Sequence, residues 1–115
     1  MRDHIAIFSH HMYEYKKGLR RMVLYTGAVE HIEHMTRRLE QNEIAFHFAE
    51  VTATKVNCFF GDPDCIEVIR SFGDRPLQEL SDHEDFILGA LLGYDLKQQC
   101  QRYLQRKSRI ITEVA

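Results

Sequence analysis

Residues 81–105 constrain the fold more than any other segment, because they encode two helix starts around an unbroken apolar run. Ser81 and Glu84 have the spacing of a capping box, in which each side chain accepts a hydrogen bond from the other residue's backbone N–H. Every residue from Phe86 to Leu92 is apolar or glycine, so this helix must be covered on more than one side. The segment therefore predicts a helix that begins at Asp82 and fills part of the interior.

A second helix is predicted after a break. Gly93 stands where a left-handed residue would end the first helix, and Asp95 with Gln98 repeats the capping signature more weakly. Four residues beyond the break recur at helical spacing and predict one apolar face: Leu96, Cys100, Tyr103 and Leu104. We expect two helices joined at residues 93–94, with one long helix over residues 82–106 as the alternative.

The length of 115 residues fits one domain over residues 1–115. A content of 44% hydrophobic and 28% charged residues is typical of soluble globular proteins. The apolar run is far shorter than the about 20 residues that cross a bilayer, and residues 1–9 lack the pattern of a signal peptide. We expect a cytoplasmic protein without a membrane partner.

The three cysteines are Cys58, Cys65 and Cys100, an odd number without CxxC spacing. This pattern speaks against a disulfide framework or a zinc ribbon and favours reduced thiols. Cys65 falls in the first turn of an expected helix, where free N–H groups stabilise a thiolate. Three neighbouring carboxylates oppose that effect and favour an inert thiol: Asp62, Asp64 and Glu67.

The remaining segments predict strands and helices. Residues 5–15 and 21–26 are expected to form an antiparallel hairpin around a turn at residues 16–18. Residues 44–51 alternate, with Ile44, Phe46 and Phe48 on one face, and residues 56–60 predict a further short strand. One helix is expected to start at Gly27. Another is expected to start at Asp62, with Pro63 in its first position, and to end at Gly73.

These elements predict an α+β fold with two layers. The small antiparallel or mixed sheet would have the chain order ββαββα, with its helices on one face. A helical pair would follow at the C-terminal end.

Charge is uneven along the chain although the net charge is only −2. Basic residues cluster at Lys16, Lys17, Arg20 and Arg21. A second basic segment contains Lys97, Arg102, Arg106, Lys107 and Arg109, and an acidic stretch lies between the two. Such a chain can pair with itself or with an acidic partner, while solvated helix faces are the alternative.

No complete catalytic or cofactor motif stands out, so no catalytic residue, cofactor or metal is assigned. His31 and His34 have a spacing at which two imidazoles can share a metal, but no third ligand is indicated, and surface histidines are the favoured interpretation. Candidates for a ligand pocket are His10, His11, His47 and Tyr94. Histidines bonded to backbone carbonyls are the alternative. The basic segments lack interleaved aromatic residues, so no nucleic-acid partner is expected.

Three stretches carry a resemblance to a known family: residues 10–26, 57–65 and 84–95, together with Gln99 and Cys100. From residue 10 to residue 107, the chain resembles a small conserved bacterial domain of unknown function that occurs beside, or fused to, flavodoxin. The resemblance implies a cytoplasmic bacterial protein that acts with a flavodoxin-type electron carrier. Because flavodoxins are acidic, it also implies the Lys16, Lys17, Arg20 and Arg21 cluster as the docking surface.

The leading hypothesis is a non-enzymatic accessory or interaction module. It would self-associate as a homo-oligomer, through the amphipathic C-terminal helix or a sheet edge. The alternative is a small-ligand or metal-responsive protein with a histidine-lined pocket, and an enzyme with an unrecognised pocket is a third hypothesis.

Overall fold

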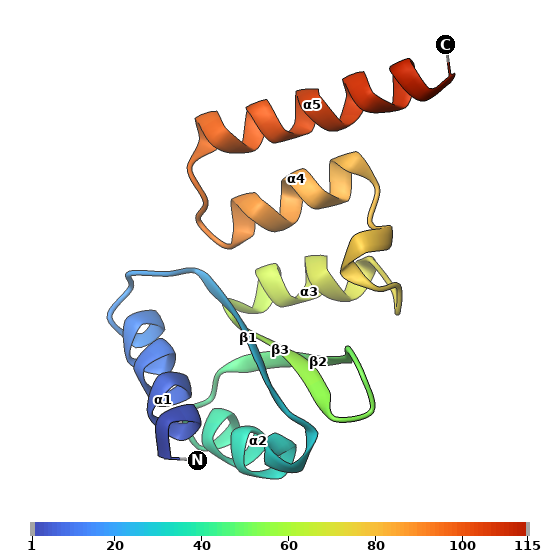
Figure 1. Cartoon of the computed structure of the whole chain (residues 1–115). Coiled ribbons are helices and arrows are strands. Elements are labelled where there is room, and N and C mark those ends of the chain that lie inside the picture. Colours follow the sequence, from blue (N-terminus) through green and yellow to red (C-terminus); the bar gives the residue numbers. More distant parts are fainter. Residues whose placement is uncertain (1, 115) are drawn as a thin grey trace.

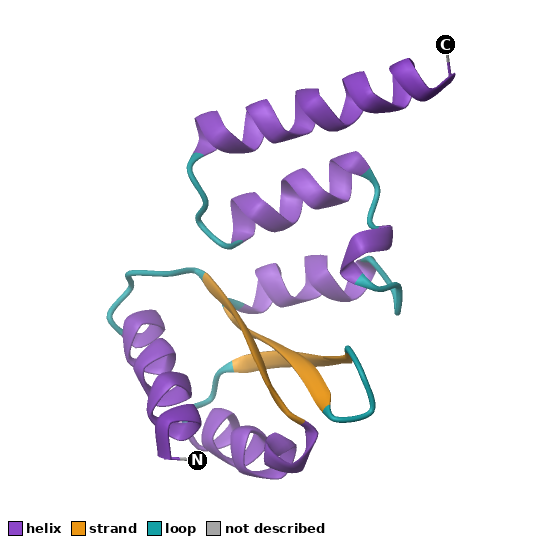
Figure 2. Ribbon diagram, in the orientation of Figure 1, coloured by secondary structure: helices purple, strands orange, loops and turns teal. Residues whose placement is uncertain are grey.

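Helices lie on both faces of a three-stranded antiparallel sheet in the computed structural model, which describes the backbone of residues 2–114 and the side chains of residues 5–108 (Figure 1). The strands are β1 (Met22–Ala28), β2 (Ala45–Glu50) and β3 (Lys55–Gly61). Their order is β1-β3-β2, with Val23 and Phe46 both opposite Phe60. The central strand β3 is therefore paired along both of its edges (Figure 2).

Two apolar clusters hold the helices to the sheet. Helices α1 (Arg2–Lys16) and α2 (Ile32–Gln41) cover one face. The cluster beneath them contains Phe8, Met12, Val23, Tyr25, Met35, Leu39, Ile44, Val56, Cys58 and Phe60. Helices α3 (Pro63–Ser71) and α4 (Asp82–Leu91) cover the opposite face. Their cluster contains Met22, Phe59, Ile66, Ile69, Leu80, Leu88 and Leu92.

The chain ends in α5 (Leu96–Val114), which packs on α4 at the far end from α1 (Figure 1). Two short 3-10 turns complete the structure, η1 (Val29–His31) and η2 (Leu77–Glu79). None of the helices in the described part of the chain has the length and hydrophobicity needed to cross a membrane.

The α+β class, the antiparallel sheet and the C-terminal helical pair are confirmed. The capping box forms: Glu84 N–H donates to Ser81 Oγ at 3.1 Å, and Ser81 N–H donates to Glu84 Oε1 at 2.8 Å. Gly93 adopts φ +79° and Gln98 N–H donates to the Asp95 carboxylate at 3.0 Å. Residues 82–106 therefore form parts of two helices, as expected.

The predicted strand over residues 5–15 is wrong, because this segment lies within helix α1. Phe8, Met12 and Tyr15 follow one another at steps of four and three residues, which is the helical period. That period places Phe8 and Met12 in the core, with 1% and 2% exposure. No hairpin with residues 21–26 forms, since β1 pairs with β3. The chain order up to α3 is thus αβαββα.

The prediction that the helices lie on one face of the sheet is also wrong, because helices cover both faces. The reason lies in β3: Val56, Cys58 and Phe60 point to α1 and α2, while Phe59 points to α3 and α4. A strand that is apolar on both faces needs cover on both. The expected helix start at Gly27 is wrong as well, since α2 begins at Ile32.

The apolar run of α4 is only partly buried. Leu88 and Leu92 lie in the core, but Ile87 remains 39% exposed and Phe86 is half-buried. One flank of this helix thus stays open beside α5.

Candidate functional site

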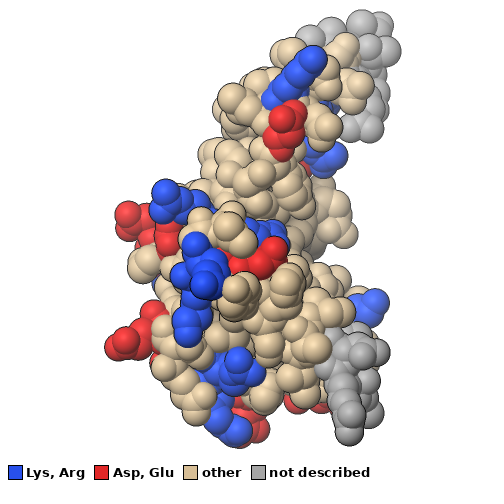
Figure 3. All heavy atoms as spheres, turned by 90° about the vertical axis from the view of Figure 1, so that its left-hand side faces the viewer, with Lys and Arg blue, Asp and Glu red and all other residues tan. Residues whose placement is uncertain are grey.

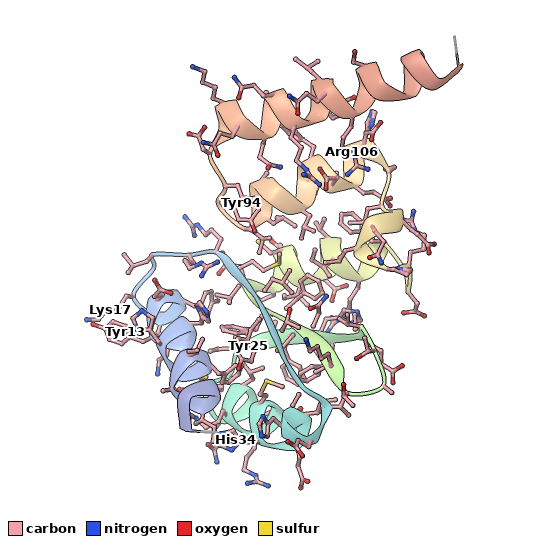
Figure 4. All side chains as sticks on the ribbon, viewed as in Figure 1. Tyr13, Lys17, Tyr25, His34, Tyr94 and Arg106 are labelled. Atoms are coloured by element: carbon pink, nitrogen blue, oxygen red, sulfur yellow. The ribbon has the colours of Figure 1, made fainter. Side chains whose placement is uncertain are left out.

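A basic cleft of about 450 Å³ lies between α1 and α2. It is lined by Ser9, Met12, Tyr13, Lys16, Lys17, Arg38 and Asn42. Lys16 Nζ donates to Asn42 Oδ1 at 2.8 Å, and Arg38 Nη1 donates to Ser9 Oγ at 3.2 Å. Lys17 Nζ lies 5.5 Å from the centre of the Tyr13 ring, and both side chains point away from the body (Figure 4). Because the lining contains no carboxylate, three cations face one cleft with neutral partners.

Arg20 and Arg21 follow α1 and are partly balanced by acidic groups. Arg20 Nη1 lies 3.7 Å from Glu14 Oε1, and Arg21 Nη1 lies 3.6 Å from Asp62 Oδ2. Figure 3 shows the side that carries α1, where several basic side chains lie near one another with acidic ones between them. The structure therefore places Lys16 and Lys17 in the cleft, and Arg20 and Arg21 outside its lining.

No motif or spacing in the sequence indicated Arg38 as a cleft residue. Its side chain reaches Ser9 across the space between α1 and α2. The spacing of Arg38 and Asn42, one helical turn apart, places both on the same side of α2. Nothing in the sequence indicated that α1 packs next to this face of α2.

The four predicted ligand residues do not share a pocket in the described structure. His10 and His11 lie on α1, with ring centres 6.4 Å apart. His47 lies on β2 with its ring 6.4 Å from that of Phe59, on the opposite face of the sheet. Burial lowers the pKa of His47. Tyr94 is 58% exposed in the connection between α4 and α5.

His31 and His34 are both half-buried, unlike the surface histidines that were expected. They line a small space with Ile5, Phe8, Tyr25 and Met35. His34 Nε2 is buried and has no hydrogen-bond partner among the described residues (Figure 4 labels His34). No group of three His, Cys, Asp or Glu side chains within the described residues is placed to hold a metal ion.

The thiols differ in their surroundings. Burial raises the pKa of Cys58 to about 12. Burial, followed by the charge of Asp62, raises the pKa of Cys65, which agrees with the inert thiol expected for it. Cys100 is exposed on α5.

An inner cleft of about 510 Å³ opens between α4, α5, η2 and β1. It is lined by Leu24, Leu77, Gln78, Asp85, Leu88, Gly89, Leu92, Tyr94, Gln99, Arg102 and Arg106. Arg102 donates two hydrogen bonds to Asp85, at 2.7 and 3.0 Å. Arg106 Nε donates to Asp82 Oδ1 at 2.8 Å. Acidic and basic segments that are distant in sequence thus meet within one chain, which the sequence left open.

An outer groove of about 440 Å³ runs along the other flank of α4 and α5. It is lined by His83, Phe86, Ile87, Cys100, Tyr103 and Leu104. Leu104 is 63% exposed although it belongs to the predicted apolar face of α5. Cys100, Tyr103 and Leu104 of the predicted face line the groove, whereas Leu96 is 66% exposed outside its lining.

The described residues therefore offer a basic cleft, an inner cleft with paired charges and an outer apolar groove. A comparison with curated proteins finds no match. Residues 6–106 match the model of a family described as a protein of unknown function (DUF2023), and the chain belongs to that family.

Proposed function

We propose that this protein is a non-enzymatic cytoplasmic interaction module that docks an acidic redox protein of the flavodoxin type. The docking surface would be the basic cleft together with Arg20 and Arg21. The observation that carries the proposal is the lining of the cleft, where Lys16, Lys17 and Arg38 have neutral partners and no carboxylate joins them. The family resemblance suggests the class of partner.

Cations without neighbouring anions keep their long-range field, which steers an acidic partner and raises the rate of encounter. The cleft also offers contact area, because Tyr13 is 55% exposed beside Lys17. A tyrosine presents an apolar ring and a polar hydroxyl to a partner, as interfaces commonly require. Charge would therefore supply attraction, and the aromatic ring would supply contact.

The test is a titration with a purified flavodoxin, measured by calorimetry at low and high ionic strength. We expect binding that weakens as salt rises, because the charges are exposed. The double variant Lys16→Glu/Lys17→Glu should lose about tenfold or more in affinity, since it reverses two charges at the interface. The matched control Lys55→Glu/Lys97→Glu makes the same charge change at exposed sites away from the cleft. Binding that ignores salt, or an equal loss in the control, would contradict the proposal.

We also propose that two copies associate through their outer grooves in a symmetric contact. Arg106 pairs with Asp82, the first residue of α4, so α5 continues to Val114 beyond the end of its neighbour. The helix thus projects past α4 (Figure 1). The groove lining contains no Lys, Arg, Asp or Glu to oppose an apolar partner, and the same groove of a second copy would be such a partner.

Light scattering coupled to size-exclusion chromatography tests the association. We expect a dimer that persists at high salt, because the contact is apolar. Leu104→Glu should give a monomer, whereas Gln105→Glu adds the same charge at an exposed position outside the groove lining and should leave the dimer intact. A monomer at all concentrations of the unmodified protein would refute this contact without affecting the docking proposal.

A further inference from the structure

A buried side-chain amide points to a ligand site that the docking function does not use. Gln99 is only 6% exposed and lines the inner cleft. No described residue forms a hydrogen bond with its carboxamide. Among the described residues, His34 Nε2 is the fully buried side-chain polar atom without a partner, so the Gln99 carboxamide keeps access to the cleft. An accessible amide held on an otherwise buried side chain is an available recognition group.

The fold makes specific room for this amide. A Cβ atom at Gly89 of α4 would lie 1.7 Å from Gln99 Nε2. The glycine therefore lets the carboxamide sit directly against the α4 backbone. Gly89 is itself buried and belongs to the cleft lining, so the two helices together hold the amide in place.

The charges of the cleft are already balanced by its own residues. Arg102 is bonded to Asp85, and Arg106 lies 3.0 Å from Asp85 and 2.8 Å from Asp82. Figure 4 shows Arg106 pointing from α5 toward α4. A charged ligand would bring a charge without a partner into this site, which is costly. The arrangement therefore favours a neutral ligand.

The rest of the lining is suited to an apolar body. Leu24, Leu88 and Leu92 come from β1 and the α4 region and form an apolar floor. Tyr94 is 58% exposed and lines the same cleft. The volume of about 510 Å³ lies within the range of small-molecule sites, which is roughly 300 to 1,000 Å³.

We propose that the inner cleft binds a small neutral organic molecule with an apolar body and a carboxamide or lactam group that pairs with Gln99. A carboxamide both donates and accepts hydrogen bonds, so its complement carries a donor and an acceptor side by side. The site is separate from the basic cleft and does not depend on the docking function.

The test is an NMR titration of the full chain with benzamide, N,N-dimethylbenzamide and benzoate. These probes share one apolar body but differ in donors and charge. We expect benzamide to shift the backbone amide signals of Gly89 and Gln99, and to bind about tenfold more tightly than the other two, the value of one good hydrogen bond. Gln99→Leu should lose that tenfold preference. The control Gln98→Leu changes the exposed neighbouring residue and should keep it.

Two results would overturn the proposal. In the first, none of the probes shifts the signals of the inner cleft, which would mean that the amide forms hydrogen bonds to water alone. In the second, Gln99→Leu binds benzamide as tightly as the unmodified protein. Thermal unfolding of the variant shows whether it is folded. If Gln99→Leu does not fold, Gln99→Met, which keeps the length of the side chain without its amide, takes its place with the same expected loss.

Discussion

Gly61 lies at the junction between β3 and α3, where the neighbouring backbone leaves no room for a side chain. Its φ of +151° is open mainly to glycine, and a Cβ atom there would lie 2.3 Å from the backbone oxygen of Arg21. Gly73, which ends α3, also has positive φ, at +79°, but nothing lies within 4 Å of a Cβ atom placed there. Substitutions at these two glycines therefore distinguish the cost of backbone strain alone from the cost of strain plus a steric clash.

We predict that Gly61→Ala lowers the free energy of unfolding by more than about 2 kcal/mol, because strain and a backbone clash add. Gly73→Ala should cost about 1 kcal/mol, from strain alone. Urea unfolding of both variants measures the difference. Equal losses would mean that the junction at Gly61 relaxes freely.

Thiol reactivity should follow burial. Near neutral pH we expect Cys100 to react first with a disulfide reagent, because it is exposed. Cys65 should react more slowly, since burial and Asp62 raise its pKa, and Cys58 should react only on unfolding, with a pKa of about 12. Mass spectrometry over time gives the order. Rapid labelling of Cys58 in the folded protein would contradict its placement in the core.

Among the helices, ion pairs join α4 to α5 and to the segment that precedes α4. Arg102 of α5 lowers the pKa of Asp85 through a hydrogen bond. Arg75, which precedes α4, lowers the pKa of Glu84 to about 2 through a second hydrogen bond. Glu84 also completes the capping box, so one carboxylate serves both the helix start and its attachment.

These shifts predict a loss of stability in acid. Because the pKa values of both carboxyls are lower in the folded state, their contribution is present above the unfolded values of about 4. It is lost as the pH falls through the folded values, toward about 2 for Glu84. Asp85→Asn should lower the free energy of unfolding by about 1 to 2 kcal/mol at neutral pH and flatten its acid dependence. Glu40→Gln, an exposed change on α2, should do neither; urea unfolding across pH checks both variants.

At the scale of the molecule, the layers form a stack from α1 and α2 through the sheet to α3, α4 and α5 (Figure 1). The extents of 51 × 32 × 26 Å reflect this elongation. No described residue of α5 belongs to either core cluster. Stability should therefore fall toward the α5 end of the stack.

Hydrogen exchange should reveal this gradient. We predict that backbone amides of β3 exchange only through global unfolding, whereas those of α5 exchange through a smaller opening of lower free energy. Phe60→Ala should lower the free energy of opening for β3 by about 3 to 5 kcal/mol. It should leave the separate opening of α5 nearly unchanged. Identical protection of α5 and β3 would show that the stack unfolds as one unit.

Much of the local structure was predictable from neighbouring residues. The capping box at Ser81, the break at Gly93 and the strands over residues 44–51 and 56–60 all formed. Each depends on hydrogen bonds or periodicities that span only a few residues. The helix over residues 5–15 was not predicted, because its aromatic and β-branched residues are also typical of a strand.

Local sequence was enough for the helix start at Ser81, the break at Gly93 and the strands over residues 44–51 and 56–60, because those features arise between residues close along the chain. Tertiary packing fixed the relations between segments: Arg38 joins Lys16 and Lys17, His47 lies on the other side of the sheet from His10, and Gly89 admits the amide of Gln99. These relations join residues on different helices and strands. They depend on how layers pack and which faces are covered, and no spacing within one segment encodes that.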